Sequence, residues 1–229
     1  MYFVLSKFEP KIHRTIYIKD PATSDLGRKI LKYSVDLIDE LGFEEFNFRK
    51  LGKHIHSTEA SIYRYFDSKH KLLIYLSSWY WGWIEYRLTF RNANINDPVQ
   101  KLTKAVEILA DFVEVKSDSE ILDTHKLFRI IFSESSKAYL IKDVDILNKD
   151  GVYYNYKQLV SAVSDIIHEI NPTYPYPHML TTTVIEGIHH QMFFSLHLKS
   201  LTDRKEGEHS ILVFYKNLIF KQLNIKTEL

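Results

Sequence analysis

The chain has 229 residues, of which 45% are hydrophobic and 26% charged, and it contains no cysteine. This composition is typical of a globular protein and excludes a disordered tail or a collagen-like chain. The lack of cysteine excludes disulfide frameworks, thiolate metal sites and cysteine nucleophiles. The formal charge of +1 shows no overall bias toward acidic or basic partners.

Residues 1–23 are predicted to form an extended arm, because Ile12, Thr15 and Ile16 follow one another without a helical period. Charged residues interrupt the arm, so no signal peptide is expected. The longest apolar run without a charge, residues 72–84, is shorter than the ~20 residues that cross a bilayer. These observations favour a cytoplasmic protein that has no contact with membranes.

Only seven glycines and six prolines interrupt the chain, which favours long helices. Ser24 or Thr23 caps a predicted first helix that ends at Gly42, and Asn47 caps a short second helix. A third helix begins after Ser57 or Thr58 and continues to about residue 66. Further helices are predicted over about 69–91, 97–113, 123–139, 152–170, 178–200 and 206–224, while residues 140–150 stay open. About nine helices without a strand pair predict an all-α fold.

Residues 46–72 carry a local positive charge. Their bases outnumber the acids Glu59 and Asp67, six to two, for a net charge of +4. Within this segment, two short helices separated by a three-residue turn have the proportions of a helix-turn-helix. A basic helix-turn-helix in an otherwise neutral chain indicates contact with DNA, although a solvated helical face has the same charge pattern.

Residues 48–55 (FRKLGKHI) and 57–69 (STEASIYRYFDSK) resemble the TetR/AcrR family of bacterial regulators. The family pattern is a short helix, a Gly-Val-Ser-like turn, a Thr-Leu-Tyr-x-x-Phe recognition helix, and a lysine at the start of the fourth helix. The resemblance covers about residues 25–73. His56 stands where the family usually has glycine, and Glu59 is acidic at a position that often faces bases.

The resemblance implies a DNA-binding domain at 24–70 and an effector-binding and dimerisation domain at 71–229. It implies a homodimer formed through the last two helices, 178–200 and 206–224. Arg64 suits a guanine edge, and Glu59 could accept from cytosine N4. Hydroxyl and ammonium groups suit phosphates. The residues carried over to the DNA are Arg49, Thr58, Glu59, Ala60, Ser61, Tyr63, Arg64, Tyr65 and Lys69.

The effector site is predicted from aromatic residues, since the chain has 15 tyrosines and 14 phenylalanines. Aromatic residues at helical spacing can equally be plain core. Trp79 and Trp83 are one turn apart and should share a face, with Trp81 pointing away. The predicted ligand-binding residues are Trp79, Trp83, Tyr86, Phe128 and Phe132.

Two further patterns are weighed against this interpretation. Glu186, His189 and His190 have a spacing that can place a carboxylate and imidazole on one helical face, as in a helical-bundle metalloprotein or enzyme. Dimer-interface or surface histidines explain the same pattern, which is the interpretation we adopt. Arg129 could anchor a buried anion, but a position on the wet side of its helix beside His125 and Ser133 is favoured.

The sequence contains no glycine-rich phosphate loop, nucleophile elbow or catalytic triad. It therefore predicts no enzyme activity, no cofactor and no metal. The expected function is a ligand-responsive repressor that binds a palindromic operator as a homodimer and is released by a small apolar or aromatic effector. The alternative is the metalloprotein or enzyme that would use Glu186, His189 and His190.

Overall fold

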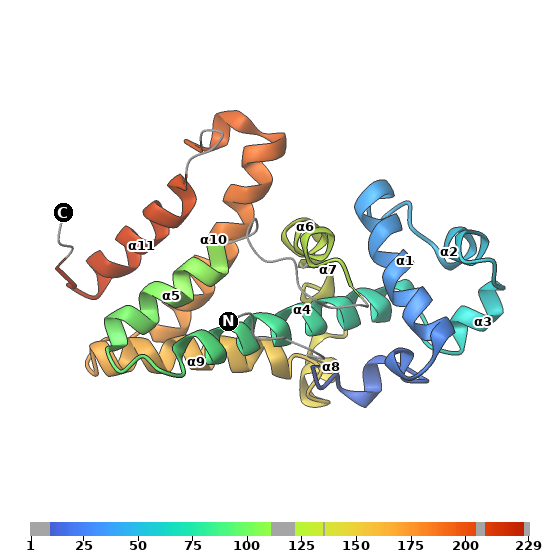
Figure 1. Cartoon of the computed structure of the whole chain (residues 1–229), viewed down its shortest axis with the longest axis horizontal. Helices are drawn as coiled ribbons and strands as arrows, with labels where there is room; N and C mark the ends of the chain where they lie inside the picture. Colours follow the sequence, from blue (N-terminus) through green and yellow to red (C-terminus); the bar gives the residue numbers. More distant parts are fainter. Residues whose placement is uncertain (1–9, 111–121, 135, 205–208, 227–229) are drawn as a thin grey trace. The chain divides into compact units, whose positions relative to one another are not determined.

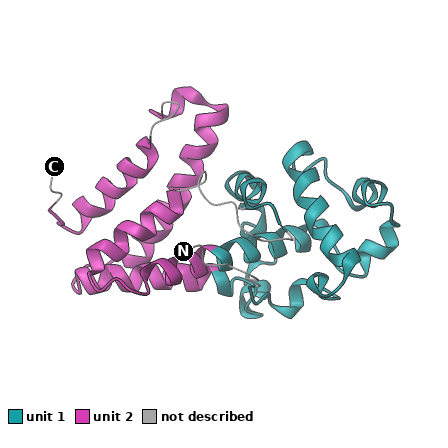
Figure 2. Cartoon of the chain, viewed as in Figure 1, with its two compact units in different colours: residues 1–83, 113–155 teal, residues 84–112, 156–229 magenta. Residues whose placement is uncertain are grey.

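A computed structural model describes residues 10–110, 122–134, 136–204 and 209–226 (Figure 1). Within these ranges the regular structure consists of eleven α-helices and three short 3-10 helices. The predicted all-α fold is confirmed. The chain divides into two compact units, residues 1–83 with 113–155 and residues 84–112 with 156–229 (Figure 2).

Unit 1 combines the amino-terminal helices with a second group from the middle of the chain. α1 packs against η2, α2 and α6, with Ile30, Val35 and Ile38 buried on its inner face. Its elements are η1 (Arg14–Ile16), η2 (Pro21–Thr23), α1 (Asp25–Leu41), α2 (Phe48–His54), α3 (Glu59–Tyr63), the first part of α4 (Lys69–Asn92), α6 (Thr124–Glu134), α7 (Ser136–Tyr139) and α8 (Val144–Lys149).

Unit 2 contains the remainder of α4 together with the carboxy-terminal helices. α10 packs against α5, η3 and α11, and α11 also packs against α5. Gly187 permits the approach of α11, because a Cβ atom there would lie 2.2 Å from the Tyr215 hydroxyl oxygen. The other elements of this unit are α5 (Pro98–Ala110), most of α9 (Tyr154–Ile170), α10 (Pro177–His197), η3 (Lys199–Leu201) and α11 (Ser210–Gln222).

The first three helices begin at side-chain caps that their sequences predict. Ser24 accepts a hydrogen bond from the Gly27 amide, Asn47 from the Lys50 amide, and Thr58 from the Ser61 amide. Each bond satisfies an amide that has no partner inside its own helix. Gly42 follows α1 with a φ of +79°, a left-handed conformation that favours glycine.

The described residues contain more helices than the nine expected. The predicted helix over 123–139 is described as α6 and α7, and the open segment 140–150 contains α8. The predicted third helix is shorter than expected, because α3 ends at Tyr63 and Arg64 already serves as its C-cap. The end of the predicted helix over 97–113 and the connection to the next helix lie outside the described residues.

The amino-terminal segment is folded against unit 1 from Pro10 onward; residues 1–9 lie outside the described part. Residues 10–23, called the arm from here on, contain η1 and η2, while Tyr17 between them is extended. The extended-arm prediction is thus corrected at the two 3-10 helices, which are too short to leave a periodic pattern. Unit 1 includes the arm and residues 113–155 besides 24–70, and the predicted domain boundaries stay a prediction.

Candidate nucleic-acid interface

α2 and α3 form a helix-turn-helix whose turn depends on two backbone features. A Cβ atom on Gly52 would lie 2.8 Å from the Ser57 carbonyl oxygen, so glycine allows the turn to close against α2. The Ser57 amide donates to the Gly52 carbonyl oxygen at 2.8 Å. His56 has a φ of +53°, which explains why glycine is the usual residue at this position and why a non-glycine residue is strained there.

One side of α3 is buried against the rest of unit 1, and the opposite side is exposed. Ile62 is fully buried, whereas Glu59, Ala60 and Arg64 are exposed. Tyr63 is 46% exposed while its ring packs edge-on against Phe48 of α2 at 5.0 Å. The outer face of α3 therefore presents one carboxylate, one guanidinium, one phenol and one small residue, which can approach a groove of DNA.

Thr58 and Ser61 are occupied by the cap of α3. The Thr58 hydroxyl accepts from the Ser61 amide at 3.2 Å and lies 2.8 Å from the Ser61 hydroxyl. Thr58 is exposed and Ser61 half-buried. Both remain close to the surface of α3, where each hydroxyl retains a further hydrogen-bonding position.

Tyr65 corrects the sequence-based prediction. Its side chain is only 4% exposed, and its hydroxyl lies 2.8 Å from the Ser24 hydroxyl. Its carbonyl oxygen accepts from the Ile18 amide at 2.8 Å. Because α3 ends before residue 65, the chain turns Tyr65 inward instead of along the outer helical face. Its side chain holds the start of α1 and is not placed to reach a phosphate.

Lys69 also has a different position from the one predicted. Its ammonium group donates to the carbonyl oxygens of Phe43, Glu44 and Phe46 at 2.9, 2.9 and 3.1 Å. A lysine ammonium has three protons, so these bonds use all of them. The nitrogen also lies 4.8 Å from the centroid of the Phe43 ring. Lys69 fastens the connection between α1 and α2 rather than projecting toward DNA.

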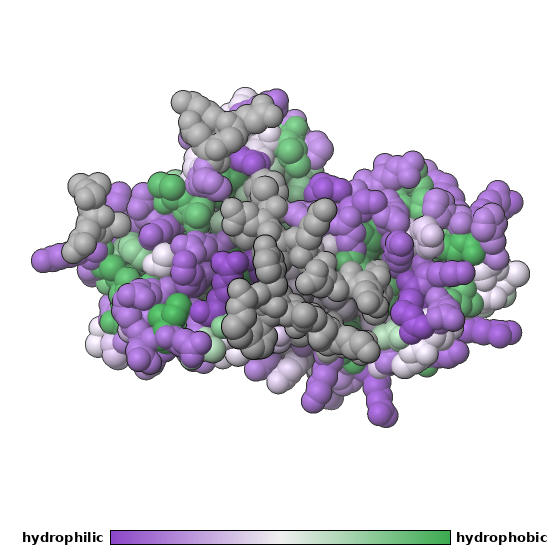
Figure 3. Space-filling model, viewed as in Figure 1, coloured by the Kyte–Doolittle hydropathy of each residue, from purple (hydrophilic) through white to green (hydrophobic). Residues whose placement is uncertain are grey.

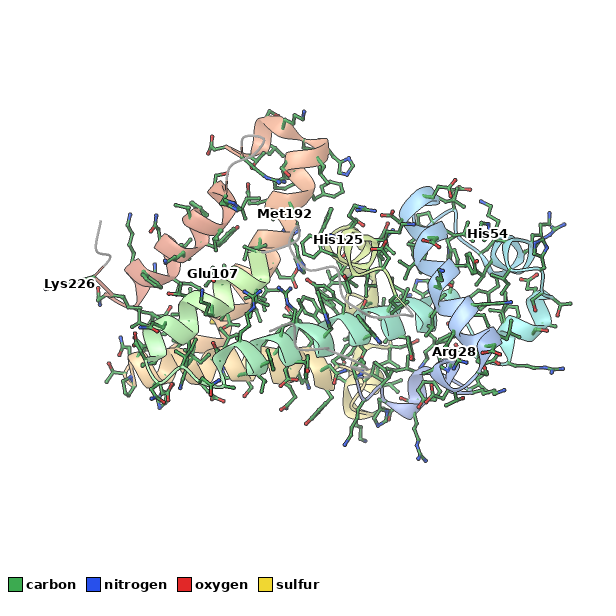
Figure 4. All side chains as sticks on the ribbon, in the orientation of Figure 1. Arg28, His54, Glu107, His125, Met192 and Lys226 are labelled. Atoms are coloured by element: carbon green, nitrogen blue, oxygen red, sulfur yellow. The ribbon has the colours of Figure 1, made fainter. Side chains whose placement is uncertain are left out.

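Residues 24–70, the predicted DNA-binding domain, are called the head from here on. The basic surface of the head is therefore smaller than its formal charge indicates. Lys50 binds the carbonyl and carboxylate of Glu45, and Lys71 donates to the Thr15 carbonyl at 2.9 Å. The exposed bases of the predicted basic segment are Arg49, Lys53 and Arg64. Lys53 was not among the predicted DNA contacts, although its place near the end of α2 in a basic segment is a usable signal. His54, also on α2, lies 5.1 Å from the Tyr33 ring of α1 (Figure 4).

Two ion pairs join α1 to α6. The two carboxylate oxygens of Asp39 accept from Nε and Nη2 of Arg129, both at 2.7 Å, and Asp36 accepts from Lys126. The hydrogen bond to Asp39 raises the pKa of Arg129, and the one to Asp36 raises the pKa of Lys126. Arg129 lies on the exposed side of α6, as the sequence favoured, and its guanidinium forms a bidentate pair there.

A third set of ion pairs extends this contact to α7. The Lys137 ammonium lies 2.6 Å from Glu44 and 2.8 Å from Glu134. The hydrogen bond from Lys137 lowers the pKa of Glu44. The sequence signal for this interface is the shared spacing of three residues, Asp36 to Asp39 on one helix and Lys126 to Arg129 on the other.

Aromatic rings from α4 and α6 meet inside unit 1. The rings of Trp79 and Trp83 are stacked, with their centroids 6.4 Å apart. The ring centroid of Phe128 lies 6.1 Å from that of Tyr80 and 5.4 Å from that of Phe132. Four of the five predicted ligand-binding residues thus belong to one cluster. Tyr80 is 2% exposed and joins this cluster, although it was not among the predicted ligand-binding residues.

The remaining tryptophan and the fifth predicted residue have separate surroundings. Trp81 is buried and packs edge-on against Tyr80 at 4.9 Å. Tyr86 belongs to unit 2, where it stacks with Phe90 at 6.3 Å.

The residues of the alternative metalloprotein interpretation do not assemble into a cluster. Glu186 accepts from the Tyr156 hydroxyl at 3.1 Å, and His190 stacks with Phe194 at 6.0 Å. Burial, and secondarily the charge of His190, lowers the pKa of His189 to about 3. Within the described parts of the chain, no group of three or more histidine, aspartate or glutamate side chains could hold a metal ion.

The exposed surface of α11 in unit 2 combines large apolar side chains with the polar side chains of Asn217, Lys221 and Gln222. Val213 and Phe214 are 54% and 57% exposed, and Leu196 at the end of α10 is exposed as well. Figure 3 shows hydrophobic residues at the surface where Figure 1 places α11. Among the helices the structure describes, none combines the length and hydropathy needed to span a membrane.

Residues 30–76 match a family model described as bacterial regulatory proteins, tetR family. The matched range includes most of α1, all of α2 and α3, and the beginning of α4. Within this range the chain is similar to the TetR family of bacterial regulators. The resemblance predicted from residues 48–69 is confirmed.

Solved structures of similar fold cover 85–90% of this chain. AibR in complex with isovaleryl coenzyme A and operator DNA is 14% identical, with a TM-score of 0.55, over 85% of this chain and 97% of that one. The ketosteroid transcriptional regulator KstR2 of Mycobacterium tuberculosis is 13% identical, with a TM-score of 0.55, over 90% and 97%. The fatty acid degradation regulator FadR of Bacillus halodurans is 16% identical, with a TM-score of 0.57, over 85% and 93%.

At these identities the likeness shows the fold. No match was found among curated proteins.

Proposed function

We propose that this protein is a homodimeric, ligand-responsive repressor that binds an inverted-repeat operator through α3. The observation that carries the proposal is the exposed face of α3, where Glu59 and Arg64 stand on a helix anchored by buried Ile62 within the TetR-family match. This face has groups that read base edges, and the helix is short enough to enter a major groove end-on.

The contacts we assign to DNA fall into two kinds. Arg64 makes a bidentate contact with guanine, and Glu59 accepts from cytosine N4 while repelling phosphates at other registers. Arg49, Lys53 and Tyr63 bind phosphates and set the register without reading sequence. Thr58, Ala60 and Ser61 allow close approach at the start of the helix. Lys53 takes the place of Lys69, which was predicted from sequence to contact DNA.

The homodimer is proposed to form through α10 and α11. Val213 and Phe214 are exposed at adjacent positions of α11, and Leu196 and Leu201 are exposed near the end of α10 and on η3. Apolar side chains of this size gain most when another helix covers them, by ~25 cal/mol for each Å² buried. A second copy of the chain supplies a matching face in a two-fold arrangement, and such symmetry requires an operator with the same symmetry.

The effector is proposed to be a small apolar or aromatic molecule bound near the aromatic cluster of α4 and α6. Two solved structures of similar fold are named for isovaleryl coenzyme A and fatty acid degradation, which agrees with an apolar acyl group. A molecule inserted beside Phe128 would displace α6. Because Arg129 on the same helix pairs with Asp39 of α1, the displacement would reach the DNA-binding head. Binding then shifts the population toward heads that no longer fit the operator.

Selection of bound DNA from a random duplex pool tests the proposal. The full chain should enrich an inverted repeat whose half-site centres lie ~34 Å apart or a multiple of it. With about 4–8 phosphates neutralised per dimer, log K should fall against log salt with a slope of roughly −4 to −7. A pool that stays random after selection, or a flat salt response, contradicts the proposal.

A further inference from the structure

The arm contacts α4 through its middle residues. Ile16 is 1% exposed, and the Thr15 carbonyl accepts from the Lys71 ammonium at 2.9 Å. The Tyr17 ring packs edge-on against Tyr75 at 6.1 Å. In Figure 1 the arm is the dark blue segment that leads into α1. These contacts make the arm an element of unit 1 rather than a loose extension.

One end of the arm is bound at the start of α9. The Asn155 side-chain amide donates to the Lys11 carbonyl at 3.2 Å and to the Ser78 carbonyl at 2.9 Å, and Asn155 is buried. Gly82 in the middle of α4 leaves room for this contact, because a Cβ atom there would lie 2.7 Å from Pro10. Glycine inside a helix is destabilising relative to alanine, so its presence here fits a need for close approach.

The other end of the arm is bound where α3 ends. The Ile18 amide donates to the Tyr65 carbonyl at 2.8 Å, and the Lys19 ammonium lies 5.2 Å above the Tyr65 ring. The Tyr65 hydroxyl meets the Ser24 hydroxyl at 2.8 Å. Arg28 of α1 adds a bond from its guanidinium to the Ala22 carbonyl at 2.8 Å (Figure 4).

α3 needs such support because it has only five residues. A helix of this length has no stability of its own, so its orientation is set by the contacts at its two ends and by its buried side. The N-terminal end is held by the Thr58 cap and the buried side by Ile62. At the C-terminal end, Tyr65 binds the arm, and the fully buried Phe66 packs edge-on against Tyr75.

We propose that the arm is a positioning element of the recognition helix, which it connects to the start of α9 so that α3 keeps the orientation required for sequence-specific DNA binding. This inference rests on the proposed function, since it assigns the arm a role in operator recognition. It differs from a purely structural role, in which the arm covers apolar surface and changes stability without changing discrimination between DNA sequences.

A pair of substitutions at Ile18 separates the backbone contact from the side chain. The Ile18 side chain is 65% exposed, so Ile18→Ala keeps the amide and serves as the control. Ile18→Pro removes the donor to Tyr65, and the extended Tyr17, with φ −134° and ψ 156°, accepts a following proline. The measurements are affinity of the full-length variants for the selected operator, affinity for a scrambled duplex of equal length, and thermal melting.

Ile18→Pro should weaken operator binding by about fivefold to tenfold, as expected for one lost hydrogen bond per head, and change scrambled-duplex binding by less than about twofold. Ile18→Ala should match the parent in both assays. Equal operator affinity for the two variants overturns the inference. An equal loss on both duplexes, accompanied by a lower melting temperature, also overturns it, because that is the result of a structural role.

A double-mutant cycle tests the connection to α9. Asn155→Ala should weaken operator binding in the same selective manner, and the double variant with Ile18→Pro should bind no more weakly than Ile18→Pro alone. Distant independent sites give additive effects, so additive losses, or no loss from Asn155→Ala, overturn the proposed connection. If the parent chain itself shows no preference for any duplex, the proposed function fails and this inference with it. Parental preference without the Ile18 effect refutes the arm's role alone.

Discussion

The exposed faces of α3 and α11 differ in the partner that each can satisfy. α3 exposes Glu59 and Arg64 around a short helix in a unit that has ion pairs and lysine–carbonyl bonds besides its buried apolar core. α11 exposes Val213 and Phe214 over a unit packed by apolar contacts. Charged groups keep their favourable hydration until a phosphate or base replaces water, whereas exposed apolar groups gain from any cover. The comparison predicts that the two faces respond in opposite ways to substitution.

Placing a charge on α11 should have the largest effect. Phe214→Glu would bury an unpaired carboxylate in the proposed dimer and weaken dimerisation at least ~100-fold, because such a charge costs about 3–5 kcal/mol. Sedimentation equilibrium of the full chain measures this change. Ile146→Glu on α8 is the control, since Ile146 is also exposed and apolar and lies outside the proposed interface. A Phe214→Glu protein that remains as dimeric as the control refutes the assignment of this face.

Truncating lysines in the head should separate a structural cation from a DNA-binding one. Lys69→Ala removes three bonds to carbonyl oxygens and should lower the free energy of unfolding by about 1–3 kcal/mol. Lys53→Ala should leave unfolding unchanged and reduce the salt slope of DNA binding by about one for each head. Chemical denaturation and salt titration measure the two effects. If Lys69→Ala reduced the salt slope and Lys53→Ala lowered the free energy of unfolding, Lys69 would be the phosphate contact, as predicted from sequence.

The confirmed and corrected parts of the sequence interpretation have different physical origins. Helices, caps and the helix-turn-helix are local, so Ser24, Asn47 and Thr58 mark them in the chain itself. Tyr65 and Lys69 match the family pattern too, but their side chains are directed by residues far away in sequence, Ser24 and Phe43. Local pattern predicted that these residues belong to the head and could not show which way they face.

The contacts between α1 and α6 could not be predicted from helical periodicity, because they too join residues far apart in sequence. Asp39 and Arg129 are 90 residues apart, and either residue alone has the pattern of a solvated helical position. Tyr80 was not predicted because Trp79 and Trp83 were taken to mark the single buried face of α4. The structure buries Tyr80 and Trp81 as well, so α4 is covered on more than one side. The matching spacings of acids on α1 and bases on α6 become informative only when the two helices are known to meet.

Neutralising Glu59 should relax the discrimination made by α3. Glu59→Gln removes the repulsion of phosphates and should raise affinity for a scrambled duplex, with a loss of about 1–3 kcal/mol of preference at one base pair of each half-site. Selection from a random pool with the variant and the parent compares the two preferences. Identical preferences would show that Glu59 contacts solvent only.

The smallest expected effect concerns a group buried in unit 2. Burial lowers the pKa of His189 to about 3, below the ~6.5 of an unfolded histidine, so the unfolded chain binds a proton that the folded chain does not. The contribution of neutral His189 to the free energy of unfolding is fully present above pH 6.5. It decreases as the pH falls toward 3, and at pH 5.5 the loss is about 1.4 kcal/mol. Denaturation of the parent and His189→Gln at pH 7.5 and 5.5 measures it. A loss of equal size in both proteins would show that His189 does not contribute.

The central claim is that two copies of α3, fixed by a dimer, read a two-fold symmetric site. Its most direct test is the affinity of the full chain for the selected palindrome and for a duplex of equal length that keeps one half-site and scrambles the other. The account predicts that the palindrome binds at least ~100-fold more tightly, since one half-site loses all base contacts of the second head. Equal affinity for the two duplexes would contradict it.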